Sequence, residues 1–299
     1  MKLETEDLVF LCEHAIDAAK DAGNLIARYS QKEVEVNKKE GVETYAAQVV
    51  TEVDYLSQDV ILKNLEPTLS KFDLGILTEE TEDNGERLQK DYFWCIDPMD
   101  GTLPFIEKTH GYSVSIGLVS RSGAPKVGVV FDPLKSTLYH AIAGVGAFKN
   151  EDMWFQDQSQ NVDALTWVMD RSLMDDFRYS ALMTKMKFYA SSKHLDLNLI
   201  QTGGGALNAC WVLDHAPACY FKLPKKGNGG GGLWDYSASA CIHECIGSSV
   251  SDIFGKPLDL NREDSTFMNH RGILYASDCQ LAADLMKICQ NTYETHPQS

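Results

Sequence analysis

The sequence predicts a layered α/β or α+β sandwich made of two halves of similar size. An amphipathic helical pattern opens the chain, strand-length apolar segments follow one another through its middle, and mixed helical and strand patterns fill the remainder. The chain has 299 residues, of which 44% are hydrophobic and 23% are charged, so it can bury a substantial core. We expect one half over residues 1–150 and the other over residues 151–299.

The first half is expected to begin with a helix from Thr5 to about Tyr29, because apolar residues such as Leu8, Leu11 and Ala15 recur at helical spacing. A charged loop or hairpin is expected over residues 32–46. A second helix should then run from about Thr51 to Leu65, with Pro67 closing that region. Four apolar segments of strand length follow, at 74–77, 92–96, 112–119 and 126–131. Gly144–Gly146 then predicts a hairpin turn.

In the second half the pattern alternates between strand and helix. Strands are expected at 166–169, 187–190 and 218–223, and helices at 180–187, 206–213 and 235–246. Three glycines, 203–205, precede one of these helices, and a glycine-rich loop, 225–232, precedes another. No repeat of solenoid period is present in the sequence, which leaves a layered sandwich as the predicted architecture.

The charge balance limits the partners. Lys and Arg number 27 against 43 Asp and Glu, and the net charge of −16 would repel a nucleic-acid polymer or an anionic membrane. The first residues are acidic where a signal peptide would be basic, and no segment is apolar enough to span a membrane. The eight cysteines lack paired metal-site spacing, so we expect reduced, mostly buried thiols and a cytoplasmic protein.

The segment 92–102 is the most informative. An apolar strand runs into Asp97 and Asp100, and Pro98 and Gly101 turn the chain where these acids occur. Two clustered carboxylates repel each other unless a hard cation such as Mg²⁺ binds between them. Backbone N–H groups near the following helix start would favour an anion beside that cation. On residue chemistry alone, a type I turn in which the aspartates only cap the chain remains an equal alternative.

Four further acidic residues change that balance. Glu79 and Glu80 follow an apolar strand, Asp235 follows Trp234, and Asp54 lies in the second helix. In this order, Asp54, Glu79-Glu80, Asp97-Pro-Met-Asp100-Gly-Thr and Trp234-Asp235 resemble the inositol monophosphatase superfamily of Mg²⁺-dependent, lithium-sensitive phosphatases. The resemblance covers nearly the whole chain and implies an α-β-α-β-α sandwich of the sugar-phosphatase type.

The resemblance also implies where metal binds. Glu79, Asp97 and the carbonyl oxygen of Met99 would hold a first Mg²⁺. Asp97, Asp100 and Asp235 would hold a second. Each half would supply part of this site, since Asp235 alone lies in the second half. A lithium-inhibited enzyme with two or three Mg²⁺ ions is the expectation that follows.

The implied catalytic residues are Asp54, Glu79 and Thr102. Thr102 and Asp54 would orient and deprotonate the attacking water, while Glu79 and water would hold a third, weaker Mg²⁺. Gly101 and Thr102 would bind the phosphate through backbone N–H groups. Clustered metals, a positioned nucleophile and a neutralised phosphate are what phosphoryl transfer requires. Many relatives are homodimers, so a homodimer is possible here.

The substrate is expected to be a small phosphate ester, and two branches of the superfamily compete. Inositol-specific members generally carry a glutamate shortly before Trp-Asp, whereas this chain has Lys222, which favours a more anionic substrate. Ser191-Ser-Lys-His194-Leu-Asp resembles the 3′(2′),5′-bisphosphate nucleotidase branch, so Ser191, His194 and Lys222 are candidate substrate residues. Gly204, in a Gly-Gly-Gly-Ala-Leu-Asn segment that resembles the inositol branch equally well, is a fourth. We favour 3′-phosphoadenosine 5′-phosphate, with inositol monophosphatase or fructose-1,6-bisphosphatase-like activity as alternatives.

Two rival classes of function remain at this point. A non-catalytic protein of the same fold could bind a sugar or nucleotide phosphate without turnover. An oxidoreductase could use Gly227–Gly232, which matches the GxGxxG dinucleotide pattern but lies late in the chain, with no ribose-binding acid after it. His243-Glu244 begins a zinc-protease pattern that Gly247 breaks, because the second histidine ligand is missing.

Overall fold

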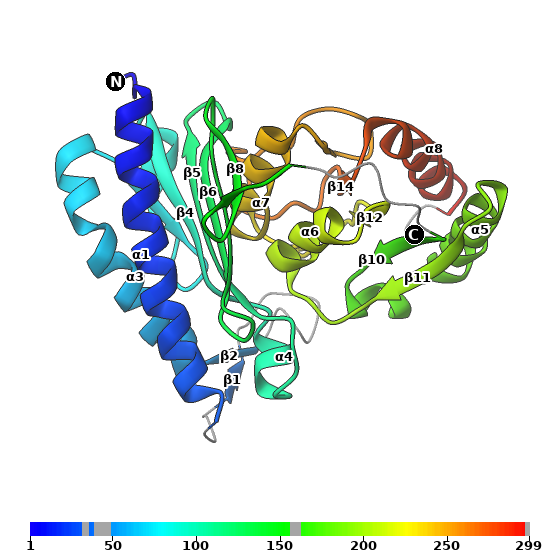
Figure 1. Cartoon of the computed structure of the whole chain (residues 1–299), viewed down its shortest axis with the longest axis horizontal. Coiled ribbons are helices and arrows are strands. Elements are labelled where there is room, and N and C mark those ends of the chain that lie inside the picture. The colour runs from blue at the N-terminus through cyan, green and yellow to red at the C-terminus, as the bar shows by residue number, and fades with distance from the viewer. Residues whose placement is uncertain (32–35, 39–48, 156–162, 297–299) are drawn as a thin grey trace.

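The elements stack in five layers in the order α-β-α-β-α, which confirms the layered sandwich predicted from the sequence and the layer order that the family resemblance implies (Figure 1). This computed structural model describes residues 1–31, 36–38, 49–155 and 163–296. Two helices form the outer layer of the first half, a large sheet lies behind them, two helices fill the middle, and a smaller sheet with two helices completes the second half. Three apolar cores lie between successive layers.

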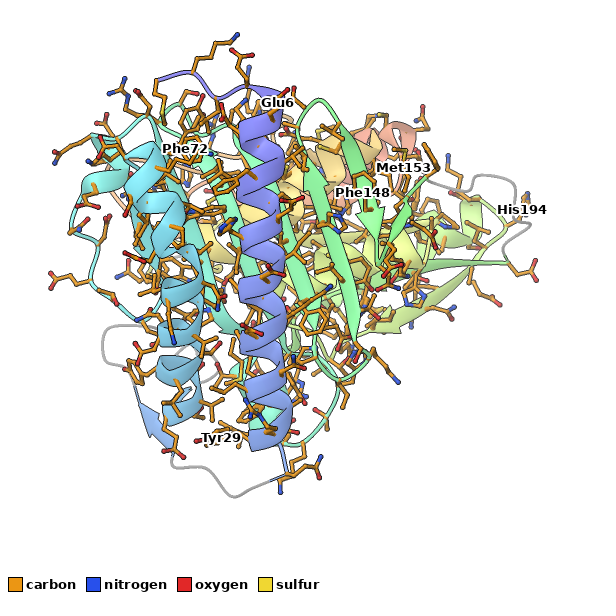
Figure 2. The ribbon with its side chains drawn as sticks, turned by 60° about the vertical axis from the view of Figure 1, so that its left-hand side comes forward. Glu6, Tyr29, Phe72, Phe148, Met153 and His194 are labelled. Carbon is orange, nitrogen blue, oxygen red and sulfur yellow. The ribbon has the colours of Figure 1, made fainter. Side chains whose placement is uncertain are left out.

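The outer layer of the first half consists of α1 (Thr5–Tyr29) and α3 (Glu52–Phe72). Figure 2 shows both helices lying side by side over one face of the larger sheet. The bounds of α1 are those predicted. The prediction that Pro67 ends the second helix is wrong, because the helix continues for five residues to Phe72. Buried contacts of Thr68, which accepts a hydrogen bond from the Trp94 indole at 2.9 Å, outweigh the cost of a proline in the last turns.

The larger sheet has seven strands among the described residues, in the order β3-β4-β5-β6-β7-β8-β9. Only β3 and β4 run parallel; the other neighbours are antiparallel. The turn predicted at Gly144–Gly146 joins β7 to β8. The bounds are β3 (Gly75–Thr78), β4 (Tyr92–Asp100), β5 (Ser113–Ser120), β6 (Pro125–Asp132), β7 (Thr137–Ile142), β8 (Gly146–Lys149) and β9 (Asp152–Met153). A separate pair, β1 (Val36–Lys38) and β2 (Val49–Thr51), lies within and just after the predicted hairpin region, most of which is outside the described residues.

The middle layer consists of α6 (Gly205–Asp214) and α7 (Leu233–Ile246), which pack between the two sheets. Ser115 in β5 donates a hydrogen bond to the carbonyl oxygen of Trp234 at 2.9 Å, so the start of α7 is fixed against the larger sheet. The glycine-rich loop leads into α7, but the next strand, β13 (Ser249–Ser251), pairs only antiparallel with β14 (Ile273–Ala276). The parallel βαβ unit of a dinucleotide-binding fold is therefore not formed around this loop in the described residues.

The smaller sheet has the order β11-β10-β12-β14-β13 among the described residues. Its remaining strands are β10 (Ala164–Val168), β11 (Asp196–Ile200) and β12 (Ala218–Lys222). The outer helices are α5 (Tyr179–Ser192) and α8 (Cys279–Thr295). Helix α8 is not among the elements predicted from the sequence. The strand predicted at 187–190 is wrong, because α5 continues through it and buries Met186 and Ala190 against the sheet.

All eight cysteines lie in described segments and are free, six of them buried, as expected. In the described part of the chain, no helix is both long and apolar enough to cross a membrane.

His243 is a buried part of the middle layer and gives a test of the fold's pH dependence. Its Nε2 lies 2.9 Å from the carbonyl oxygen of Ala209 and its Nδ1 lies 2.8 Å from the Ser248 hydroxyl. Burial lowers the pKa of His243 to about 4. Because the unfolded state binds this proton more tightly, stability that is present above pH 6.5 is lost as the pH falls toward 4.

We expect His243 to account for about 2 kcal/mol of the decrease in unfolding free energy between pH 7 and pH 5. Denaturant unfolding of wild type and His243→Gln at both pH values measures this difference. His194→Gln, at an exposed position, is the control. An equal pH dependence in all three proteins would contradict the prediction.

Candidate active site

Three carboxylates from distant parts of the sequence meet at one end of the larger sheet. Glu79 directly follows β3, Asp97 lies in the neighbouring parallel strand β4, and Asp235 lies in the first turn of α7. Their nearest oxygens all lie within 4.8 Å of one another. The N–H of Glu79 donates to the carbonyl oxygen of Ile96 at 3.1 Å, so the pairing of β3 with β4 brings the first two acids together. The chain thus builds an all-oxygen donor set suited to a hard cation.

Asp100 connects this cluster to the middle layer. Its carboxylate accepts hydrogen bonds from the backbone N–H groups of Gly205 at 2.9 Å and Ala206 at 2.8 Å, at the start of α6. A register shift between Asp97 and Asp100 interrupts the pairing of β4 with β5 at this point. The Ser57 hydroxyl donates to the carbonyl oxygen of Pro98 at 2.7 Å and fixes the intervening turn to α3.

The electrostatics show that these acids are costly without a cation. Burial, followed by the negative charge of Glu79, raises the pKa of Asp97 well above its usual range. Burial and Asp235 likewise raise the pKa of Asp100, while its two backbone hydrogen bonds oppose the shift. Burial and Glu79 raise the pKa of Asp235 to about 6. A positive ion among these groups would offset both the cost of burying the charged carboxylates and their mutual repulsion.

Asp54 and Thr102 form a hydrogen-bonded pair beside the cluster. The Thr102 hydroxyl donates to Oδ1 of Asp54 at 3.2 Å. The other oxygen, Oδ2, accepts from the Thr51 N–H at 2.8 Å and the Thr51 hydroxyl at 2.7 Å. Asp54 is buried and its carboxylate closes the N-terminal capping box of α3, so its orientation is fixed by the start of that helix.

A cavity of about 320 Å³ opens onto the carboxylate cluster and Thr102, and the buried Asp54 is not part of its lining. It is lined by loops from both halves of the chain, and Glu79, Asp97 and Asp235 all form part of its wall. The other predicted site residues that line it are Met99, Asp100, Gly101, Thr102, Gly204 and Lys222. Gly101 precedes the short helix α4 (Thr102–Ile106) with a φ of 89°, which places the first N–H groups of α4 beside the cavity.

Lys222 reaches the cavity, but it is not a free positive charge. Its Nζ lies 2.5 Å from Oδ2 of Asp170, and it also lies over the rings of Tyr220 and Tyr236. Burial opposes its charge, yet Asp170 and the other neighbouring groups raise its pKa overall. The Asp170 carboxylate therefore offsets part of the positive charge on which the expectation of a more anionic substrate rests.

The structure does not bring Ser191 and His194 to this cavity. Ser191 lies in the last turn of α5, and Figure 2 shows His194 at the outer edge of the molecule, beyond the smaller sheet. Both are exposed, and neither lines the cavity. The prediction that both residues contact the substrate does not agree with their position, because Ser191 and His194 lie at and just after the end of the outer helix α5.

Sequence reasoning missed several residues of the cavity wall, four of which bear on its chemistry. Asp170, Arg171 and Ser172 follow β10, and Phe267 comes from the segment between β13 and β14. The first three had a usable signal, since they directly follow a predicted strand, and polar residues collect at the carboxyl ends of strands that run parallel, as β10 does with β11 and β12. Phe267 had none, because it lies in a segment without regular structure.

Gly204 tests the tightness of this arrangement. A Cβ at Gly204 would lie 2.2 Å from Oδ1 of Asp100. Gly204→Ala is therefore expected to push Asp100 off the N-terminus of α6, lowering kcat for the phosphate release that the sequence resemblance implies at least about 10-fold and destabilising the fold by about 1–3 kcal/mol. Steady-state kinetics and denaturant unfolding measure both.

Gly247→Ala is the control for that experiment. Gly247 ends α7 with a φ of 80°, and a Cβ there would meet no atom within 4 Å. This variant should lose stability through backbone strain but keep its kcat. If Gly204→Ala were as active as Gly247→Ala, close packing at Asp100 would not matter for catalysis.

Comparison with known proteins identifies the family. Residues 7–291 match the model of the inositol monophosphatase family. The chain is 31% identical over 242 residues to the Nus factor SuhB of Haemophilus influenzae, covering 80% of this chain and 83% of the relative. It is 29% identical to the 3′(2′),5′-bisphosphate nucleotidase CysQ of Aggregatibacter actinomycetemcomitans over 261 residues, covering 87% and 90% of the two chains.

Solved structures agree on the fold. The SuhB protein of Bartonella henselae superposes with a TM-score of 0.72 at 21% identity, covering 93% of this chain and 97% of that one. The inositol monophosphatase of Thermotoga maritima gives the same TM-score and identity, covering 95% and 98%. The chain belongs to the inositol monophosphatase family and is a phosphatase.

Proposed function

We propose that this phosphatase is a Mg²⁺-dependent phosphomonoesterase acting on 3′-phosphoadenosine 5′-phosphate or a closely similar 3′(2′),5′-bisphosphate nucleotide. The observation that carries the proposal is the group formed by Glu79, Asp97 and Asp235, whose oxygens lie within 4.8 Å of one another in the cavity wall. The donors are all hard oxygens, and their repulsion calls for a cation, so the residues fit Mg²⁺.

In this proposal, the clustered carboxylates and their neighbours would hold the Mg²⁺ ions. Glu79, Asp97 and the carbonyl oxygen of Met99 would hold one ion, and Asp97, Asp100 and Asp235 a second. Glu79 would support a third with water. When bound, Mg²⁺ neutralises phosphate charge and makes water more acidic.

The chain's own groups supply the remaining chemistry. Thr102 donates its hydroxyl proton to Asp54, which leaves the Thr102 oxygen as an acceptor for a proton of the attacking water. The Asp54 carboxylate, held in place by Thr51, provides the negative charge that draws the proton from Thr102. The N–H groups of Gly101 and Thr102 would orient the phosphate. Water adds to phosphorus as it loses one proton through Thr102 to Asp54, the ester P–O bond breaks, and the leaving oxygen takes a proton from solvent water, so that alcohol and inorganic phosphate form; Asp54 then returns its proton to solvent.

Cationic groups support a doubly phosphorylated substrate. Arg171 and Lys225 line the cavity together with Lys222. Arg171 also forms an ion pair of 2.5 Å with Glu107, and Lys222 pairs with Asp170, so these two side chains are held in place while the carboxylates offset part of their charge. One relative named above carries the name of a bisphosphate nucleotidase, which agrees with this choice.

Inositol 1-phosphate is the second candidate substrate. The Asp170 carboxylate in the cavity wall accepts hydrogen bonds from the Tyr220 hydroxyl at 2.8 Å and the Asn208 amide at 3.2 Å. A carboxylate at this place could also accept the hydroxyls of a polyol ring.

Phosphate release from 3′-phosphoadenosine 5′-phosphate, inositol 1-phosphate and fructose 1,6-bisphosphate tests the proposal. We expect release that requires Mg²⁺, falls with Li⁺ and is fastest with the nucleotide. Faster release from inositol 1-phosphate would replace the substrate part of the proposal. Release from none, with ligand-dependent thermal stabilisation by the nucleotide, would support a non-catalytic binding protein instead.

A further inference from the structure

We propose that Phe267 is a specificity-determining residue whose ring packs against the nucleobase of the substrate, an inference that rests on the proposed function. Phe267 lines the same cavity as the three clustered carboxylates and is only partly buried. It lies in the segment between β13 and β14, outside any helix or strand. An aromatic side chain left partly open beside a reaction centre provides a surface on which a flat ring can stack.

Backbone hydrogen bonds hold Phe267 at a fixed position relative to the carboxylate cluster. Gly232 and Phe267 form an isolated antiparallel bridge. On either side of it, the Leu233 N–H donates to the carbonyl oxygen of Thr266 at 2.9 Å, and the Met268 N–H donates to that of Gly231 at 2.9 Å. Gly232 and Leu233 lead directly into the first turn of α7, where the Gly232 N–H donates to Asp235 at 2.9 Å. Phe267 is therefore fixed relative to a carboxylate of the cluster.

Arg262 is the positioning residue for this segment. Its side chain is only 9% exposed, and its Nη1 donates to the carbonyl oxygen of Phe267 at 2.8 Å and to Oδ1 of Asn269 at 3.0 Å. Asp264 holds the other face of the guanidinium through Nε at 2.7 Å and Nη2 at 2.6 Å. Asn269 in turn donates to the carbonyl oxygen of Gly227 at 2.7 Å. Such a network fixes the backbone that carries the ring before any ligand binds, which lowers the entropy cost of binding.

One part of the cavity wall, apart from its charged residues, suits a flat, apolar-faced group. Leu103, Pro104 and Leu173 also line it, and the glycines 229–232 line it without side chains. A nucleobase can place its ring faces against such a wall and keep its polar edge free. A polyol ring carries hydroxyls all round, and those facing this wall would lose hydrogen bonds. The glycine-rich loop and Phe267 together thus favour a nucleotide over inositol phosphate.

The test compares Phe267→Ala and Phe267→Leu with wild type. We expect Phe267→Ala to raise KM for 3′-phosphoadenosine 5′-phosphate about 5- to 150-fold, the effect of losing one stacked base. The nucleotide KM of Phe267→Leu should lie between those of wild type and Phe267→Ala. In both variants, kcat/KM for glycerol 2-phosphate, which has no ring, should change less than about 2-fold, because only the stacking contact is lost. Phe188→Ala, at a phenylalanine that is 78% exposed on α5, is the matched control and should alter nothing.

Direct binding separates this inference from the proposed function. Calorimetric titration with adenosine 3′,5′-bisphosphate should show weaker binding to Phe267→Ala, whether or not the protein hydrolyses it. Arg262→Met should raise the nucleotide KM while leaving kcat and the glycerol 2-phosphate reaction near wild type, and Arg262→Lys should recover part of the loss. Equal losses on both substrates, or unchanged nucleotide binding in Phe267→Ala, would overturn the inference even if phosphatase activity is confirmed. Binding without turnover would uphold it and reject the proposed reaction.

Discussion

Asp97→Asn is expected to lower kcat for phosphate release at least about 1,000-fold, equivalent to about 4 kcal/mol of transition-state stabilisation. Asp97 is the member of the cluster that lies closest to complete burial, at 2% exposure, and it belongs to both proposed ion sites. An amide keeps the size and the hydrogen bond from the Met99 N–H, which lies 3.0 Å from Oδ1. It removes the negative charge that a hard cation needs. Phosphate-release kinetics across a Mg²⁺ titration measure the loss.

The same substitution is expected to stabilise the metal-free protein. Burial and Glu79 both disfavour the charged form of Asp97, so neutralising it removes a repulsion that exists whenever no cation is bound. The unfolding temperature without Mg²⁺ should rise, by about 2–4 °C for each kcal/mol relieved. The increase in unfolding temperature that Mg²⁺ gives wild type should shrink or vanish.

Asp59→Asn is the matched control, because Asp59 is exposed on α3, outside the cavity. It should leave kcat, the metal-free unfolding temperature and the Mg²⁺ effect unchanged. If Asp97→Asn lowered the metal-free unfolding temperature, the carboxylate would be a structural group. The opposite signs expected for activity and stability are what distinguish a site for a cation from a buried polar network.

The sequence points directly to two members of the cluster, because they follow runs that become neighbouring strands, whereas Asp235, in the first turn of α7, is indicated only by the family resemblance. Glu79 and Asp97 follow strand-length apolar runs, and parallel pairing of β3 with β4 carries both to one edge. The bounds of α1 follow in the same way from helical periodicity over a long segment. Such local signals survive folding because burial of one face enforces them.

Predictions that depend on distant packing did worse. The chemistry of Pro67 argues for a helix end, but buried side chains on both sides of it continue α3 to Phe72. Ser191 and His194 match a short motif, yet the extra length of α5 carries them to the outer edge. Phe267 is placed by a bridge to Gly232 and by the Arg262 network, and neither contact leaves a periodic trace in the sequence. A motif states which groups are available, whereas tertiary pairing decides which of them meet.

Thr102→Val should lower kcat about 100- to 10,000-fold, the range for a lost general acid–base group. Valine keeps the shape of the side chain but removes the hydroxyl that donates to Asp54 at 3.2 Å. Thr102→Ser, which retains a hydroxyl, should stay within about 10-fold of wild type, well below that range. Because Thr102 is partly exposed at the start of α4, both variants should unfold near the wild-type temperature.

The double variant shows whether Thr102 and Asp54 act as one unit. Asp54→Asn keeps an oxygen for the Thr51 cap but cannot hold the negative charge that draws the proton from Thr102. If the proton passes through both groups, either single change already breaks the path, and Thr102→Val with Asp54→Asn should cost no more than the worse single variant. Losses that multiply would mean that the two residues act independently. Asp54 would then serve α3 as a helix cap, and the water would have to lose its proton to another of the carboxylates around the cavity.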